Sequence, residues 1–259
     1  GVVIGNGGVL YGTTFYGGTG NNGVVFQLVP PASPGGVWTE TILHKFAGSP
    51  GDGANPHTAV TPGSGGVLYG TTYNGGASGH GTVYQLTPPA SPGGAWAETV
   101  IHDFAGSPND GANPHGNLLP GADGVLYGTA LSGGEFGQGM VFSLTPPASP
   151  GGAWTETVLY SFAGGTDAAE PRAALVMELD GSLYSTTYEG GTSGVGTVFS
   201  VSPPASPGGA WTETVWHSFS GADGANPEAG LVMDSNGVLY GATFYGGTSN
   251  LGVLFSLDP

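Results

Sequence analysis

One segment recurs along almost the whole chain, and it constrains the fold more than any single residue does. Leu10-Tyr11-Gly12-Thr13-Thr14 returns in closely similar form, beginning at Leu68, Leu126, Leu183 and Leu239. The intervals are 58, 58, 57 and 56 residues, and a near-constant period of this size is typical of repeat architectures. We therefore expect one domain over residues 1–259, with repeat units of about 1–57, 58–115, 116–172, 173–229 and a partial 230–259.

The fourth repeat shows what each unit contains. Leu175–Met177 is a short apolar run before the turn Asp180-Gly181, and Leu183–Tyr188 follows. Thr197–Val201 and Trp211–Phe219 are rich in β-branched and aromatic residues, and the last of these segments alternates with a period of two. Four short antiparallel strands per repeat predict an all-β fold, a five-bladed β-propeller. A β-solenoid is the alternative, but its coils are usually shorter than about 30 residues.

The last repeat holds only three of these strands. The Trp-x-Glu-Thr strand occurs at Trp38, Trp96, Trp154 and Trp211, and has no fifth copy. We therefore expect the last blade to lack one strand within this chain and to have an open edge, which can pair with another chain. Removed sequence, an unseen segment or a neighbouring subunit would supply the missing strand.

Composition limits the partners. Two basic residues oppose 18 acidic ones, a net charge of −16, so binding to a nucleic acid phosphate backbone is not expected. No apolar run reaches the roughly 18 to 20 residues that span a bilayer, so membrane insertion is not expected either. The chain has no cysteine, which excludes disulfides and thiolate metal sites.

The segment Phe219–Pro227, followed by Leu231–Gly241, Tyr245-Gly246-Gly247 and Gly252–Phe255, resembles the Gloeo/Verruco (GloVer) tandem repeats of bacterial choice-of-anchor surface proteins. The resemblance covers essentially the whole chain and implies secretion or cell-surface location, with no established activity. The Asn-Gly-x-Leu-Tyr-Gly portion is also similar to five-bladed lectins of the tachylectin type, which implies glycan binding.

A loop between repeats is the candidate cation site. Its three copies place an aspartate three residues before an asparagine, at Asp52 and Asn55, Asp110 and Asn113, and Asp223 and Asn226. Carboxylate and amide oxygens are ligands that Ca²⁺ prefers, so calcium is the candidate cofactor for this loop. We expect no other cofactor. The alternative, which we favour, is that these side chains cap their own backbone in a turn.

Three further groups of residues occupy equivalent positions in successive repeats. His44, His102, Tyr160 and His217 fit an aromatic packing position, whereas His57, His115, Arg172 and Glu228 suggest an exposed rim. Glu40, Glu98, Glu156 and Glu213 belong to different blades, so we expect them on solvated strand faces, too far apart for the paired carboxylates of a glycosidase.

Aromatic residues in the glycine-rich turns are the candidate ligand-binding positions: Tyr16, Tyr73, Tyr188 and Tyr245. Their rings could stack on sugars, although packing between blades is the favoured alternative. No residues combine into a nucleophile, base and orienting group, so we do not expect the chain to be an enzyme. The sequence predicts a non-enzymatic, extracellular structural module that self-associates through its open edge. A glycan-binding module is the alternative, and a polysaccharide-active enzyme is the third choice.

Overall fold

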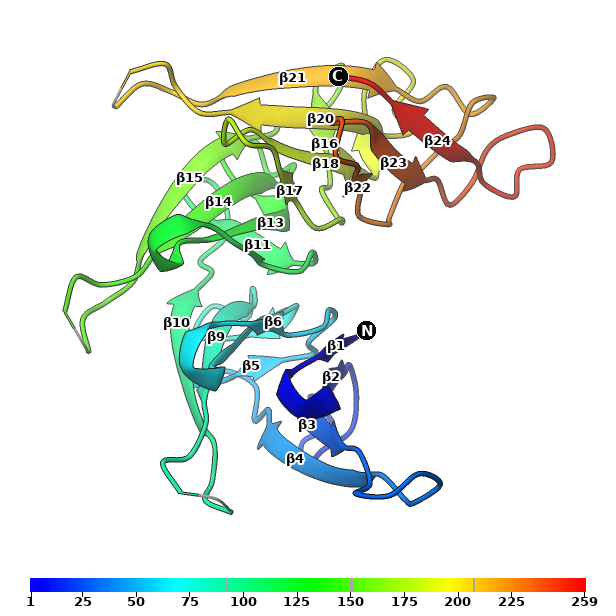
Figure 1. Ribbon diagram of the computed structural model, residues 1–259. Coiled ribbons are helices and arrows are strands. Elements are labelled where there is room, and N and C mark those ends of the chain that lie inside the picture. Colours follow the sequence, from blue (N-terminus) through cyan, green and yellow to red (C-terminus); the bar gives the residue numbers. More distant parts are fainter. Residues whose placement is uncertain (92, 150, 207) are drawn as a thin grey trace. The chain divides into compact units, whose positions relative to one another are not determined.

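A computed structural model describes residues 1–91, 93–149, 151–206 and 208–259, and it shows antiparallel β-sheets joined by turns (Figure 1). The only helices among these residues are three single 3₁₀ turns, η1 (Asn6–Gly8), η2 (Ser64–Gly66) and η3 (Ala122–Gly124). The chain divides into two compact units. Unit 1 comprises residues 1–105 and 148–154, and unit 2 comprises residues 106–147 and 155–259. The expectation of a single domain over residues 1–259 stays a prediction.

Unit 1 contains two four-stranded sheets and a short ribbon. The first sheet has the order β1 (Val2–Ile4), β2 (Leu10–Thr14), β3 (Val24–Val29), β4 (Thr39–Lys45). The second has the order β6 (Thr61–Pro62), β7 (Leu68–Thr72), β9 (Thr82–Thr87), β10 (Ala97–Asp103). Strands β5 (Gly53–Ala54) and β8 (Asn74–Gly75) form the ribbon. The four antiparallel strands predicted for a repeat are thus present in both sheets.

Unit 2 repeats this organisation. One sheet contains β11 (Gly111–Pro114), β12 (Leu119–Pro120), β13 (Leu126–Gly133), β14 (Met140–Thr145) and β15 (Thr155–Ser161). The next has the order β17 (Val176–Met177), β18 (Leu183–Thr187), β20 (Thr197–Ser202), β21 (Thr212–Ser218), beside a ribbon of β16 (Ala168–Ala169) and β19 (Glu189–Gly190). The last sheet has three strands, β22 (Val232–Met233), β23 (Leu239–Ala242) and β24 (Leu254–Leu257).

The core of unit 1 lies between its two sheets. Its buried members are Val25, Leu43, Phe46, Val60, Leu68, Tyr84 and Leu86. Trp96, from the Trp-x-Glu-Thr segment of the second repeat, packs edge-on against Tyr11 of the first repeat at 6.3 Å. The first repeat therefore buries its apolar face against the second, as expected for a repeat protein.

A glycine in the Leu-Tyr-Gly-Thr segment allows this close packing. A Cβ added at Gly70 would overlap the ring of Tyr84, which lies directly opposite it on β9. The corresponding ring is Phe26 opposite Gly12 in the first repeat, and Phe142 opposite Gly128 in the third. The aromatic side chain on the neighbouring strand thus occupies the space that a Cβ at these glycines would take.

Unit 2 has two apolar clusters that follow the same plan. The first includes Phe162 and Phe199, whose rings meet edge-on at 5.0 Å. The second includes Phe219 and, partly buried, Phe255, at 5.1 Å. No helix in the described parts of the chain is long and apolar enough to cross a membrane.

Candidate functional site

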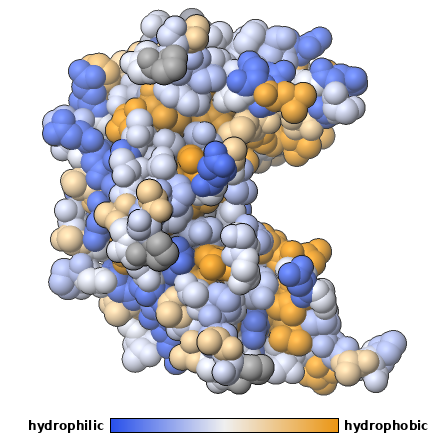
Figure 2. Space-filling model, turned by 60° about the vertical axis from the view of Figure 1, so that its left-hand side comes forward, coloured by the Kyte–Doolittle hydropathy of each residue, from blue (hydrophilic) through white to orange (hydrophobic). Residues whose placement is uncertain are grey.

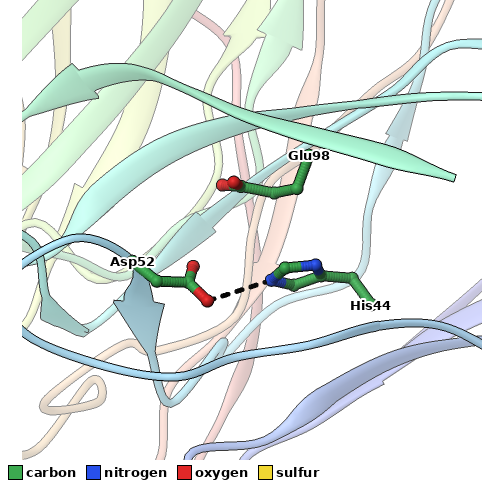
Figure 3. Close-up of side chains that lie close together, drawn as sticks. All are labelled: His44, Asp52 and Glu98. Carbon is green, nitrogen blue, oxygen red and sulfur yellow. Dashed lines mark hydrogen bonds and ion pairs between the residues drawn. The ribbon is translucent and has the colours of Figure 1, made fainter.

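Three ionisable side chains from separate segments of unit 1 meet at the rim of its core. His44 lies on β4, Asp52 in the turn before β5, and Glu98 on β10 (Figure 3). His44 Nε2 and Asp52 Oδ2 are 3.1 Å apart. A nitrogen of His44 and one carboxylate oxygen from each acid all lie within 4.8 Å of one another. We call these three residues the His44 cluster.

Asp52 is held in place by its own turn. Its Oδ2 accepts a hydrogen bond from the Ala47 amide at 2.7 Å, and its Oδ1 accepts one from the Gly53 amide at 2.6 Å. Burial by itself raises the pKa of Asp52, but the hydrogen bonds from His44, Ala47 and Gly53 outweigh burial and lower the pKa below its ordinary value. Asp52 is therefore a fixed carboxylate at neutral pH.

His44 is oriented by packing. Its ring lies edge-on to Phe46, with ring centroids 4.7 Å apart. The His44 side chain is 20% exposed and the Asp52 side chain 13%, so solvent reaches the cluster.

Glu98 completes the cluster from the neighbouring sheet. It pairs with Leu86 in the β9–β10 ladder, and its Oε1 is buried without a hydrogen-bond partner among the described residues. Burial, followed by the negative charge of Asp52, raises the pKa of Glu98 to about 7, against the opposing effect of His44. A buried acceptor without a partner is costly, so this carboxyl group calls for an explanation.

Unit 2 contains a counterpart in which tyrosine replaces histidine. The Tyr160 hydroxyl donates to Asp167 Oδ2 at 3.3 Å, and Asp167 accepts from the amides of Ala163 and Ala168 at 2.7 and 2.8 Å. Glu213 lies against this pair. Burial, then the charge of Asp167 and a hydrogen bond with it, raise the pKa of Glu213 to about 7. In this arrangement a phenol thus takes the place of the imidazole of the His44 cluster.

The pair His217 and Asp223 in unit 2 repeats the histidine and the aspartate of the His44 cluster. His217 Nε2 and Asp223 Oδ2 are 3.0 Å apart, and Asp223 Oδ1 accepts from the amide and hydroxyl of Ser220 at 2.8 Å each. No glutamate of the described residues is hydrogen-bonded or ion-paired to this pair. A cavity of about 210 Å³ opens beside it instead, lined by His217, Phe219, Asp223, Phe255, Ser256 and Leu257.

The expectation for the four repeat glutamates is therefore only partly right. Glu40 is exposed, as expected, but Glu98, Glu156 and Glu213 each bury one carboxylate oxygen. Solvated strand faces were the wrong prediction for these three, because each of them lies against an aspartate that follows the fourth strand of the preceding repeat. The recurrence of this glutamate in every Trp-x-Glu-Thr strand was the available signal.

The structure separates the aspartates and asparagines proposed for calcium. The asparagines have left-handed backbone, with φ of 60° at Asn55, 56° at Asn113 and 53° at Asn226. Asn55 and Asn226 donate through Nδ2 to the carbonyls of Phe15 and Tyr188, both at 2.9 Å.

The aspartates, unlike the asparagines, accept hydrogen bonds from backbone amides of their own turn. Asp110 is buried and accepts from the Gly111 amide at 2.6 Å, as Asp52 does from Gly53. The aspartates thus make the local contacts of the turn interpretation, whereas Asn55 and Asn226 bond to carbonyls distant in the sequence. Calcium binding by the loop stays a prediction.

The four tyrosines proposed to bind ligands differ in their surroundings. Tyr16 is 65% exposed and Tyr245 43% exposed, whereas Tyr73 is half-buried. The Arg172 guanidinium lies 3.5 Å from the centre of the Tyr188 ring and covers it.

Arg172 is only partly exposed, whereas His57 and Glu228 at equivalent positions are exposed, so the expectation of an exposed rim is partly confirmed. Its guanidinium is ion-paired to Glu170 at 2.9 Å and to Glu228 at 2.7 Å. Glu228 occupies the position of Arg172 in the next repeat, so the two form a cross-repeat pair. Opposite charges at equivalent positions of adjacent repeats were the signal for it.

The fold and these repeated contacts define an all-β tandem-repeat protein of the β-propeller-like class. Its sequence matches the Gloeobacter/Verrucomicrobia repeat over residues 1–153 and 91–259, so the chain belongs to this repeat family. None of the curated proteins compared with the chain matches it in sequence.

Solved structures share the fold at low sequence identity. A protein provisionally assigned as a gluconolactonase has a TM-score of 0.51 and 14% identity, with 96% of this chain and 79% of that one covered. A protein of unknown function from Dyadobacter fermentans has a TM-score of 0.53 and 12% identity, with 99% and 77% covered. At these identities the likeness concerns the fold alone.

Proposed function

We propose that the chain is a non-enzymatic, extracellular module, a five-bladed propeller that assembles by accepting a strand along β24. The observation that carries this proposal is the three-stranded last sheet. In the other repeats the third strand is covered by a Trp-x-Glu-Thr strand, whereas no described strand pairs with the outer edge of β24. An unpaired strand edge offers backbone hydrogen bonds to another polypeptide.

The repeat pattern also indicates which kind of strand would pair with β24. In the other repeats the glutamate pairs with the apolar residue near the end of the third strand, as Val201 does with Glu213 and Leu28 with Glu40. Leu257 is the equivalent residue on β24. An incoming strand of the Trp-x-Glu-Thr type would therefore place its glutamate opposite Leu257, beside the cavity at His217 and Asp223.

Burial supports the same interpretation. Phe199 is fully buried on β20, whereas Phe255, its equivalent on β24, is only partly buried, and Leu254 is 86% exposed. Hydrophobic side chains also remain visible on the face shown in Figure 2. Covering β24 would remove apolar surface from water and so favour association.

A labelled peptide with the sequence of residues 209–219 tests this function. We expect saturable binding by fluorescence anisotropy, and concentration-dependent self-association of the chain in sedimentation velocity. The matched control peptide carries Thr214→Pro, which removes a backbone donor and should bind much more weakly. Equal binding of both peptides, or a chain that stays monomeric and binds neither, would refute the proposal.

Glycan binding is the second candidate, and one observation favours it. Phe244 and Tyr245 form an exposed aromatic corner in unit 2, with rings 4.6 Å apart. In unit 1 the exposed Tyr16 lies against the half-buried Phe15, at 4.8 Å. Aromatic faces of this kind can stack on sugar rings. A glycan array that compares the wild type with Tyr245→Ala tests it, and an unchanged binding profile would exclude this corner.

A further inference from the structure

We propose that the His44 cluster binds a divalent transition-metal ion of the zinc class. The three ligands would be His44 Nε2, Asp52 Oδ2 and one carboxylate oxygen of Glu98, with water completing the coordination. This inference is independent of strand addition at β24, because every residue that carries it belongs to unit 1.

The ligand types point to this class of ion. A set of one imidazole nitrogen and two carboxylate oxygens suits Zn²⁺ and its first-row neighbours, whereas Ca²⁺ and Mg²⁺ prefer oxygen alone. Two ligand atoms about 2.0–2.1 Å from a tetrahedral ion lie about 3.3 Å apart. The 3.1 Å between His44 Nε2 and Asp52 Oδ2 is close to this value.

Glu98 provides the second, independent observation. Figure 3 shows its carboxylate projecting from β10 toward the pair formed by His44 and Asp52, and the only interaction drawn among the three residues joins those two. Its Oε1 is fully buried and has no hydrogen-bond partner among the described residues. An ion between the three side chains would satisfy this oxygen.

The tyrosine-containing counterpart shows why the first cluster suits an ion better. In unit 2 the Tyr160 hydroxyl donates to Asp167, and Glu213 Oε1 is buried without a partner among the described residues, as Glu98 Oε1 is. In the His44 cluster, Asp52 and His44 act on Glu98 through their charges, and no hydrogen bond joins Glu98 to either. Histidine also offers a nitrogen lone pair, whereas a neutral phenol is a poor zinc ligand.

Access and charge are compatible with binding. His44 and Asp52 keep part of their side chains in contact with solvent, so an ion and a water can reach them. The chain carries a net charge of −16, which attracts cations to its surface. The ion would link β4 of the first sheet to β10 of the second and so stabilise unit 1.

Comparison with the Tyr160 arrangement in unit 2 suggests the variants for the test. His44→Tyr introduces the residue that unit 2 already uses, and Glu98→Gln keeps the side-chain volume. After removal of metals with a chelator, each protein is titrated with Zn²⁺ by calorimetry and with Co²⁺ by visible absorption. We expect each substitution to remove one bound ion per chain, with affinity at that site reduced by about 100-fold or more. Tyr160→His should add one ion, because Asp167 and Glu213 are already in place.

His80→Tyr is the matched control, because His80 is an exposed histidine of unit 1 outside the cluster. It should leave the number of high-affinity ions unchanged. Circular dichroism of the metal-free proteins separates a lost ligand from a lost fold, and Zn²⁺ should raise the unfolding midpoint of the wild type more than that of His44→Tyr. Zinc binding that is the same in the wild type, His44→Tyr and Glu98→Gln would overturn the proposal, as would no binding up to about 1 mM Zn²⁺.

Discussion

Replacing Glu213 with glutamine should make the stability of the protein less sensitive to pH. In the folded protein the pKa of Glu213 is raised from its ordinary value of 4.5 to about 7, first by burial and then by Asp167. The folded state therefore binds more protons than the unfolded state between these two values. Stability contributed by the protonated carboxyl group is fully present below about pH 4.5, is lost progressively as pH rises, and is absent above about pH 7.

The size of this effect follows from the shift. At about 1.4 kcal/mol per pKa unit, a shift from 4.5 to about 7 corresponds to about 3 kcal/mol for a fully buried group. Glu213 is partly exposed, so screening by solvent reduces the expected loss to about 1–2 kcal/mol. A glutamine is uncharged at all pH values and can still donate a hydrogen bond to Asp167.

Urea unfolding of the wild type and Glu213→Gln at pH 5 and pH 8 measures the effect. We expect similar stabilities at pH 5 and a variant that is more stable than the wild type by about 1–2 kcal/mol at pH 8. Glu189→Gln is the control, because Glu189 is exposed, and it should show no such difference. A free-energy difference between Glu213→Gln and the wild type that is the same at both pH values would refute the reasoning.

Four further substitutions test the packing, each by denaturant unfolding. Tyr84→Phe should raise the free energy of unfolding by up to about 1 kcal/mol, because its buried hydroxyl has no partner among the described residues; a loss would show that the hydroxyl is bonded. Phe199→Ala should cost about 3–5 kcal/mol and Phe255→Ala clearly less, because Phe255 is only partly buried; equal costs would contradict this account. Asn226→Ala should cost about 1–2 kcal/mol, through its left-handed φ and the lost bond to Tyr188; no change would discount both contributions.

Much of the local structure could be predicted from the repeats. The turn at Asp180-Gly181 does separate two paired strands, with Val176 opposite Tyr184, and the alternating Trp211–Phe219 segment contains β21. These features depend on turn chemistry and on a period of two, which act over a few neighbouring residues. Local patterns of this kind can be read directly from a sequence.

The candidate sites could be predicted only in part. The loop containing Asp52 and Asn55 was identified, but the two side chains have different partners, because the left-handed backbone at Asn55 lets it reach Phe15 while Asp52 caps its own turn. Glu98 was expected in solvent. Alternation assigns a side chain to a face of its strand, but it does not tell what packs on that face.

The sequence by itself determined the repeat, the strands within each repeat and the family to which the chain belongs, because these follow from local pattern and periodicity. Only the tertiary structure decided that a histidine, an aspartate and a glutamate from two successive repeats meet in the His44 cluster. His44 and Glu98 are more than 50 residues apart in the sequence. Their contact exists because two separate sheets pack face to face over an apolar core, and no local pattern encodes that distance.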